Sequence, residues 1–220
     1  MERAFRDRME GGQRLAAALQ PYASDPSVVV LGLPRGGVPV AYEVASALHA
    51  PLDVFVVRKL GVPGHSELAM GAIARGGVRV INPDVVASLN IPQFTMDAVA
   101  EREMHELERR ERTYRGDLPP ANLSRRTVIL VDDGLATGST MRAAVAAVRQ
   151  YDPARIVVAV PVAAKETCER LRREVDDVVS VVMPQDFHAV SLWYREFTQT
   201  SDGEVRRLLV AANAAGARGD

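Results

Sequence analysis

Two adjacent carboxylates and a group of hydroxyl side chains lie close together in residues 127–141, TVILVDDGLATGSTM. Asp132 and Asp133 supply acceptor oxygens, which suit the hydroxyl groups of a sugar or a hard cation such as Mg²⁺. Residues 137–140 supply hydroxyl donors, and the glycine among them allows an anion to approach the backbone closely. A ligand with a phosphate at one end and hydroxyls at the other fits this pattern, and a phosphorylated ribose is such a ligand.

The flanking residues predict the elements that position these groups. Residues 128–131 are apolar and largely β-branched without a helical period, which indicates a buried parallel strand, whereas residues 141–150 carry apolar side chains at helical spacing. The hydroxyls would then lie at a helix N-terminus, where free N–H groups and the helix dipole attract an anion. The simpler alternative is a capped helix, with the acidic pair as turn formers and Ser139 as the cap, although a cap alone needs fewer polar groups.

A second segment repeats the order of strand, glycine loop and helix. Residues 28–33, VVVLGL, predict another buried strand, and PRGGVP precedes a helix-like segment at residues 40–50. Gly36 and Gly37 allow a tight turn around an anion, and the forked guanidinium of Arg35 can contact phosphate oxygens. The segment therefore indicates a second anion site, the alternative being a plain turn with a surface arginine.

The motif VDDGLATGST resembles the phosphoribosyl pyrophosphate (PRPP) signature of type I phosphoribosyltransferases. The resemblance implies a phosphoribosyltransferase-like, Rossmann-type α/β fold with a mostly parallel sheet flanked by helices and a small hood. It implies transfer of ribose 5-phosphate between PRPP and a nitrogenous base, which is purine-like or of another kind, with pyrophosphate as the leaving group. It also implies that Asp132 and Asp133 hold Mg²⁺. On this resemblance the PRPP-binding residues are Arg35, Gly36, Gly37, Arg58, Lys59, Asp132, Asp133, Ala136, Thr137, Gly138, Ser139 and Thr140.

A glycine- and proline-containing stretch follows a third predicted strand at residues 52–57, with Arg58 and Lys59 directly after that strand. Residues 61–67 are typical of a mobile loop. By resemblance this is the flexible loop that closes over PRPP and excludes water. His65 and Glu67 join Asp132 and Asp133 as catalytic candidates because they can exchange a proton with the base, the alternative being solvated loop residues.

The acceptor base is the least defined part of the ligand. The resemblance implies base contacts from Phe187, after a last predicted strand at residues 177–183, and from Lys165, after a predicted strand at residues 154–164. Ala136 stands where hypoxanthine-guanine enzymes carry an acid, which favours the adenine and orotate enzymes. The remaining aromatic residues near the C-terminus, Trp193, Tyr194 and Phe197, predict a packed cap.

Three other segments predict accessory structure. Residues 3–19 predict an amphipathic helix, and residues 71–81 predict a hairpin that turns on two glycines. Residues 101–115 predict a charged helix with a narrow apolar stripe and with glutamate–arginine pairs at i,i+4 spacing. That helix is expected to be mostly a solvated face, and an interaction role is the alternative.

The whole composition limits the class of protein. With 220 residues, a net charge of −1 and 5% aromatic residues, we expect a single domain over residues 1–220 and no nucleic-acid partner. Its hood would come from residues 1–20 and 184–210, and residues 83–116 would be a helical insertion. Cys168 is the only cysteine, which fits a reducing cytoplasm, and no apolar stretch is long enough to span a membrane. The partners expected are PRPP and a small base, and the oligomeric state stays open, with a homodimer among the possibilities.

Two other functions fit the same residues. A PRPP-sensing regulator without turnover is favoured by Ala136 and by the extra charged helix, and is disfavoured by His65, Glu67 and the balanced charge. A generic nucleotide-binding α/β protein is the weaker rival, and it would bind ribose 5-phosphate compounds as well as it binds PRPP.

Overall fold

The core of the protein is a five-stranded sheet with the strand order β2-β1-β6-β7-β8, in which all pairs are parallel. The computed structural model describes residues 4–216, apart from the side chains of residues 66, 67, 215 and 216. Every residue of β1 and β6 is buried, as their continuous apolar sequences predict for strands that are covered on both faces. The strands are β1 (Val28–Gly32), β2 (Leu52–Val54), β6 (Thr127–Val131), β7 (Arg155–Val162) and β8 (Asp177–Val182).

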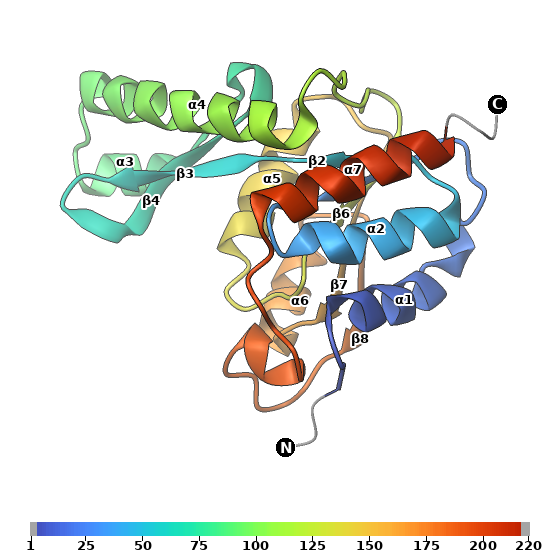
Figure 1. Cartoon of the computed structure of the whole chain (residues 1–220). Coiled ribbons are helices and arrows are strands. Elements are labelled where there is room, and N and C mark those ends of the chain that lie inside the picture. The colour runs from blue at the N-terminus through green and yellow to red at the C-terminus, as the bar shows by residue number, and fades with distance from the viewer. Residues whose placement is uncertain (1–3, 217–220) are drawn as a thin grey trace.

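Helices cover both faces of this sheet (Figure 1). One face packs against α1 (Arg8–Ala18), α2 (Gly37–Leu48) and α7 (Asp202–Gly216), and the other packs against α5 (Ser139–Arg149) and α6 (Lys165–Leu171). Successive strand residues point to opposite faces, so Ile129 belongs to the first apolar cluster and Leu130 to the second. The predicted fold class, a mostly parallel sheet flanked by helices, is confirmed.

A smaller antiparallel sheet extends from one side of the core together with two helices (Figure 1). Its strand order is β3-β4-β5, and α4 packs against β3 and β4. The hairpin predicted over residues 71–81 is formed by β4 and β5, and the predicted charged helix is the second half of α4. We call residues 57–115 the antiparallel lobe. It comprises β3 (Val57–Val62), β4 (His65–Ala74), the 3₁₀ turn η2 (Arg75–Gly77), β5 (Arg79–Ile81), α3 (Pro83–Ser88) and α4 (Gln93–Arg115).

Two predictions at the start of this lobe are wrong. The strand predicted over residues 52–57 divides into β2, which belongs to the parallel sheet, and β3, which pairs with β4. The loop predicted over residues 61–67 is a hairpin, since only Pro63 and Gly64 separate β3 from β4. Gly64 has φ +78°, and a proline followed by a glycine with positive φ suits a type II turn. Pro63 and Gly64 therefore form only a two-residue turn, because the residues on either side of them pair with each other as β3 and β4.

The segment before α1 lies beside residues 193–196, which precede α7. The helix predicted over residues 3–19 begins at Arg8, since Asp7 caps it by accepting a hydrogen bond from the Glu10 N–H at 2.9 Å, and residue 3 lies outside the described residues. Ahead of that cap, the Phe5 N–H donates to the Trp193 carbonyl at 3.0 Å, and Phe5 forms a β-bridge with Tyr194.

The remaining elements in the described part of the chain are two short 3₁₀ turns, η1 (Gln20–Tyr22) and η3 (Val190–Trp193). Trp193 and Tyr194 are buried together with Phe5, which confirms that these aromatic residues pack as a cap. Within residues 4–216, no helix has the length and the apolar character needed to cross a membrane.

Candidate functional site

Asp132 and Asp133 directly follow β6, at the carboxyl edge of the parallel sheet, where ligands of open α/β sheets bind. Oδ1 of Asp132 accepts a hydrogen bond from the Asp133 N–H at 2.9 Å, and Oδ2 of Asp133 accepts one from Nε of Arg8 at 2.8 Å. Burial raises the pKa of Asp132 well above its ordinary value, and the charge of Asp133 raises it further. Burial also raises the pKa of Asp133, while Arg8 opposes that rise. Hydroxyl donors or a cation brought by a ligand would stabilise the ionised pair.

Residues 134–140, which we call the hydroxyl loop, lead from the acidic pair into α5. Gly138 is the residue before the helix and has φ +75°, a conformation that favours glycine. A Cβ at this position would also lie only 2.6 Å from Cγ2 of Thr167, whose hydroxyl donates to the Ala136 carbonyl at 2.6 Å. Residues 137, 139 and 140 are exposed, and the backbone hydrogen bonds of α5 begin with the Arg142 N–H donating to the Gly138 carbonyl. The loop therefore presents hydroxyls and a helix N-terminus to solvent, which is an arrangement that binds phosphate.

Residues 33–37 after β1, which we call the glycine loop, pack directly on Asp132 and Asp133. A Cβ at Gly37 would lie 2.6 Å from the Val131 carbonyl oxygen and 2.8 Å from Cα of Asp132. A Cβ at Gly36 would lie 2.8 Å from Cγ of Asp133 and would overlap its carboxylate. Both glycines are thus required for the close approach of two loops, a role that their sequence did not distinguish from turn formation. The peptide bond between Pro34 and Arg35 is cis.

Arg35 lies in this loop and forms an ion pair with Asp202, the first residue of α7, at 3.8 Å. The two side chains are 37% and 45% exposed, so the pair is weakly held and its guanidinium is accessible to a ligand. The C-terminal helix therefore starts beside the predicted anion site.

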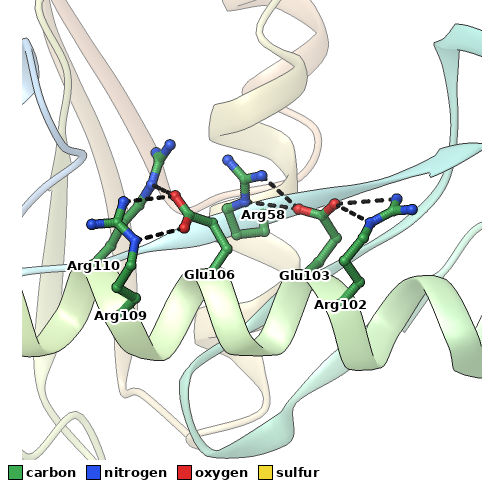
Figure 2. Close-up of polar contacts among 6 residues, drawn as sticks. All are labelled: Arg58, Arg102, Glu103, Glu106, Arg109 and Arg110. Carbon is green, nitrogen blue, oxygen red and sulfur yellow. Dashed lines mark hydrogen bonds and ion pairs between the residues drawn. The ribbon is translucent and has the colours of Figure 1, made fainter.

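The lobe residues predicted to bind PRPP lie within strands. Arg58 is part of β3 and not beyond a strand end, and its Nε and Nη2 atoms donate to Oε2 of Glu103 on α4 at 2.9 and 2.6 Å (Figure 2). Lys59 is the next residue of β3 and is exposed, as is His65 at the start of β4. The side chain of Glu67 lies outside the described residues. The structure thus joins Arg58 to the charged helix, and its predicted contact with PRPP stays a prediction.

The two predicted base contacts lie on the core. Lys165 is the exposed first residue of α6. Phe187 follows β8, is half-buried and packs against the aromatic cluster of Phe5, Trp193 and Tyr194.

The segment that contains Phe187 is close to the acidic motif. A Cβ at Gly134 would lie 2.8 Å from Cγ2 of Val190, three residues beyond Phe187. This contact brings the start of the C-terminal cap against the residue that follows Asp133.

Two residues that touch the acidic pair were missed by sequence reasoning. Arg8 is 125 residues from Asp133, and Tyr194, whose hydroxyl donates to the Asp133 carbonyl at 2.6 Å, is 61 residues from it. Burial raises the pKa of Tyr194, which keeps its phenol protonated as a donor. Neither residue belongs to a motif, so no local signal could have identified them.

The donor set also fits Mg²⁺. This ion is commonly held by one or two carboxylates together with substrate phosphates and water, and Asp132 and Asp133 can supply the carboxylates. In the part of the chain that the structure describes, no group of three or more His, Cys, Asp and Glu side chains is arranged to hold a metal ion.

Comparisons with known proteins identify a family and several related proteins. A family model described as "Phosphoribosyl transferase domain" matches residues 6–192. The crystal structure of TT1426 from Thermus thermophilus is 45% identical, covers 94% of this chain and 98% of that chain, and superposes with a TM-score of 0.86. "Putative phosphoribosyl transferase Rv0571c" of Mycobacterium tuberculosis, and its counterpart MT0597 in a second strain, are each 47% identical over 209 residues. That alignment covers 95% of this chain and 47% of each relative, so the chain spans about half the length of the curated relatives it matches.

Proposed function

This chain belongs to the phosphoribosyl transferase domain family, and on that premise we propose that it is an enzyme that transfers ribose 5-phosphate between PRPP and a nitrogenous base. A nitrogen of the base attacks C1 of the ribose, the bond from C1 to pyrophosphate breaks, and pyrophosphate leaves. The observation that carries the proposal is the contact of the glycine loop with the acidic pair, directly ahead of the open hydroxyl loop. PRPP carries a pyrophosphate, two ribose hydroxyls and a 5-phosphate, which is one group for each of these three features.

Each part of PRPP is assigned to chain groups of matching chemistry. Residues 137–140 and the N-terminus of α5 bind the 5-phosphate through hydroxyls and free N–H groups. Asp132 and Asp133 accept hydrogen bonds from the ribose hydroxyls. Arg35 and the glycine loop bind pyrophosphate, for which Arg35 exchanges its exposed ion pair with Asp202 for a doubly hydrogen-bonded contact. These contacts hold C1 in place for attack.

Asp132 and Asp133 are also the residues that would hold Mg²⁺. When bound, the ion neutralises charge on the pyrophosphate oxygens. The guanidinium of Arg35 stabilises the negative charge that builds on the leaving group as the bond to C1 breaks.

The acceptor side of the site is proposed from two places. Phe187 offers a ring face for a heteroaromatic base and Lys165 a hydrogen-bond donor to it, and the packing of Val190 on Gly134 supports a cap beside the ribose. His65 and Glu67 on the β3–β4 hairpin are proposed to exchange the proton of the base, with Arg58 and Lys59 on the same hairpin adding positive charge. The packing of β3 against α5, the helix that follows the hydroxyl loop, supports a role for this hairpin.

Release of pyrophosphate tests the proposal. Wild-type protein is incubated with PRPP, Mg²⁺ and a panel of purine, pyrimidine and other heteroaromatic bases, and pyrophosphate and the nucleotide product are both quantified. We expect both products in equal amounts with at least one base, and neither without a base. Tight PRPP binding without release of pyrophosphate for any base would contradict an enzymatic function.

A PRPP-sensing regulator without turnover is the second candidate, favoured by one observation. Ala136, an exposed residue of the hydroxyl loop, carries no group that could act on a base. A regulator predicts PRPP binding without turnover and a shift of a DNA or RNA fragment on a gel that depends on PRPP. Turnover in the pyrophosphate assay would exclude this alternative.

A further inference from the structure

Arg8 joins three separate parts of the chain at the candidate site. It is the first residue of α1, and its Nε atom donates to Oδ2 of Asp133 at 2.8 Å. Its Nη1 atom donates to the Thr198 carbonyl at 2.6 Å, and its guanidinium carbon lies 3.8 Å from the centre of the Phe197 ring. The guanidinium is therefore fixed by an aromatic face and a backbone acceptor as well as by the carboxylate.

The Arg8–Asp133 pair is shielded from solvent. The Arg8 and Asp133 side chains are 12% and 16% exposed, so their charges are screened far less than those of a surface pair. The Asp133 backbone is fixed by the Tyr194 hydroxyl, and the Gly36 backbone lies against the carboxylate. A Cβ at Gly36 would also lie 3.3 Å from Nε of Arg8, so the glycine loop, the acidic pair and Arg8 meet at one place.

We propose that Arg8 is a positioning residue, which orients the Asp133 carboxylate for the ribose hydroxyls of PRPP. This inference rests on the proposed function. A carboxylate has two oxygens, and the contact from Arg8 uses Oδ2 of Asp133. With Oδ2 held by Arg8 and packed against Gly36, rotation of the carboxylate is restricted, and Oδ1 is the atom that receives a ribose hydroxyl. Arg8 itself does not contact the reacting atoms.

Arg14 provides a matched control on the same helix. Its Nη1 atom donates to the Ala4 carbonyl at 2.8 Å, and its guanidinium carbon lies 4.9 Å from the centre of the Phe5 ring. Arg14 thus combines a backbone acceptor with an aromatic face, as Arg8 does, but its hydrogen bond goes to the Ala4 carbonyl and not to the acidic pair. Replacing either arginine by alanine removes the same atoms and the same charge from α1.

The test measures PRPP binding by calorimetry and steady-state kinetics at saturating Mg²⁺, for wild type, Arg8→Ala, Arg8→Lys and Arg14→Ala. Unfolding curves first establish a temperature at which every variant is folded. We expect Arg8→Ala to weaken PRPP binding about tenfold or more, the loss typical of a hydrogen bond between charged groups. The KM for PRPP should rise while the KM for the base stays within about twofold. Arg8→Lys should recover part of the loss, because lysine keeps the charge without the fork, and Arg14→Ala should bind PRPP as wild type does.

Three results would overturn the inference. Equal losses of PRPP affinity in Arg8→Ala and Arg14→Ala would show that α1 only stabilises the fold. Tighter binding by Arg8→Ala would show that Arg8 competes with the ligand for Asp133. If Arg8→Ala binds PRPP as wild type does, the positioning role is wrong although the proposed function stands. Failure of the wild type itself to bind PRPP would instead remove the proposed function, and this inference with it.

Discussion

The carboxyl edge of the parallel sheet and the antiparallel lobe use their charged residues in opposite ways. At the sheet edge, Asp132 and Asp133 are crowded by backbone from the glycine loop, and burial makes their charges costly. In the lobe, the Glu106 side chain of α4 is 30% exposed and pairs with both Arg109 and Arg110 (Figure 2). Carboxylates whose ionised form is destabilised by burial at the end of a core strand are stabilised when a ligand binds them. Charges that are paired with neighbours on the same helix mainly stabilise that helix.

Adding one methyl group to the glycine loop should have the largest effect. Gly37→Ala places a Cβ against the Val131 carbonyl and the Asp132 backbone, neither of which can move without displacing β6. We expect the free energy of unfolding to fall by about 3 kcal/mol, measured by urea denaturation. The control is Gly61→Ala in β3, where nothing lies within 4 Å of the added Cβ and the change should stay within about 0.5 kcal/mol. Similar losses at both positions would contradict the contrast between the two regions.

Removing one charge from the acidic pair should affect turnover and not the fold. Asp133→Asn keeps the side-chain shape but weakens the contact with Arg8 and with the ribose hydroxyls. Turnover of PRPP should fall about 100-fold or more, because positioning and charge are both impaired. Glu106→Gln in the lobe is the control and should leave turnover unchanged. Full Mg²⁺-dependent activity of Asp133→Asn would refute the role assigned to the acidic pair.

The pairing of Arg58 with Glu103 can be measured by a double-mutant cycle. The two side chains are 28% and 13% exposed, so Arg58→Ala, Glu103→Gln and the double variant should show a coupling free energy of about 1 kcal/mol in urea unfolding. Additive effects would mean that the pair contributes nothing to joining β3 to α4. In that case the predicted contact of Arg58 with PRPP would become the stronger explanation for a cation at this position.

The smallest effect concerns the ion pairs of Glu106 with Arg109 and Arg110 on α4. Hydrogen bonds from Arg109 and then from Arg110 lower the pKa of Glu106 to about 2 from an ordinary value near 4.5. Because the pKa is lower in the folded state, the stabilisation is present above about pH 4.5 and is lost as the pH falls through about 2. The difference in melting temperature between wild type and Glu106→Gln should therefore be small at pH 6 and should vanish near pH 2. High salt should reduce it at pH 6, and a difference that grows with acid would contradict this assignment.

Local sequence signals were sufficient where one element determines its own position. The apolar run of β6, the acidic pair that ends it and the glycine before α5 lie within a few residues, and the strand, loop and helix follow from them. The charged helix was predicted for the same reason, since the pair formed by Glu106 and Arg110 depends only on spacing within a helix. The β3–β4 hairpin was missed because an edge strand such as β3 is recognised mainly through its partner, which is β4.

The sequence by itself determined the order of the elements, the α/β class and the polar groups that a phosphorylated ribose requires. Only the tertiary structure decided which backbone lies against the acidic pair and which cation meets it. Gly37 and Arg8 lie far from the end of β6 along the chain but contact it in the fold. No local sequence pattern indicates these contacts. The physical reason is that a helix, or a buried strand with a continuous apolar run, depends mainly on neighbours along the chain, whereas the site is assembled where the parallel strands β1 and β6 end side by side.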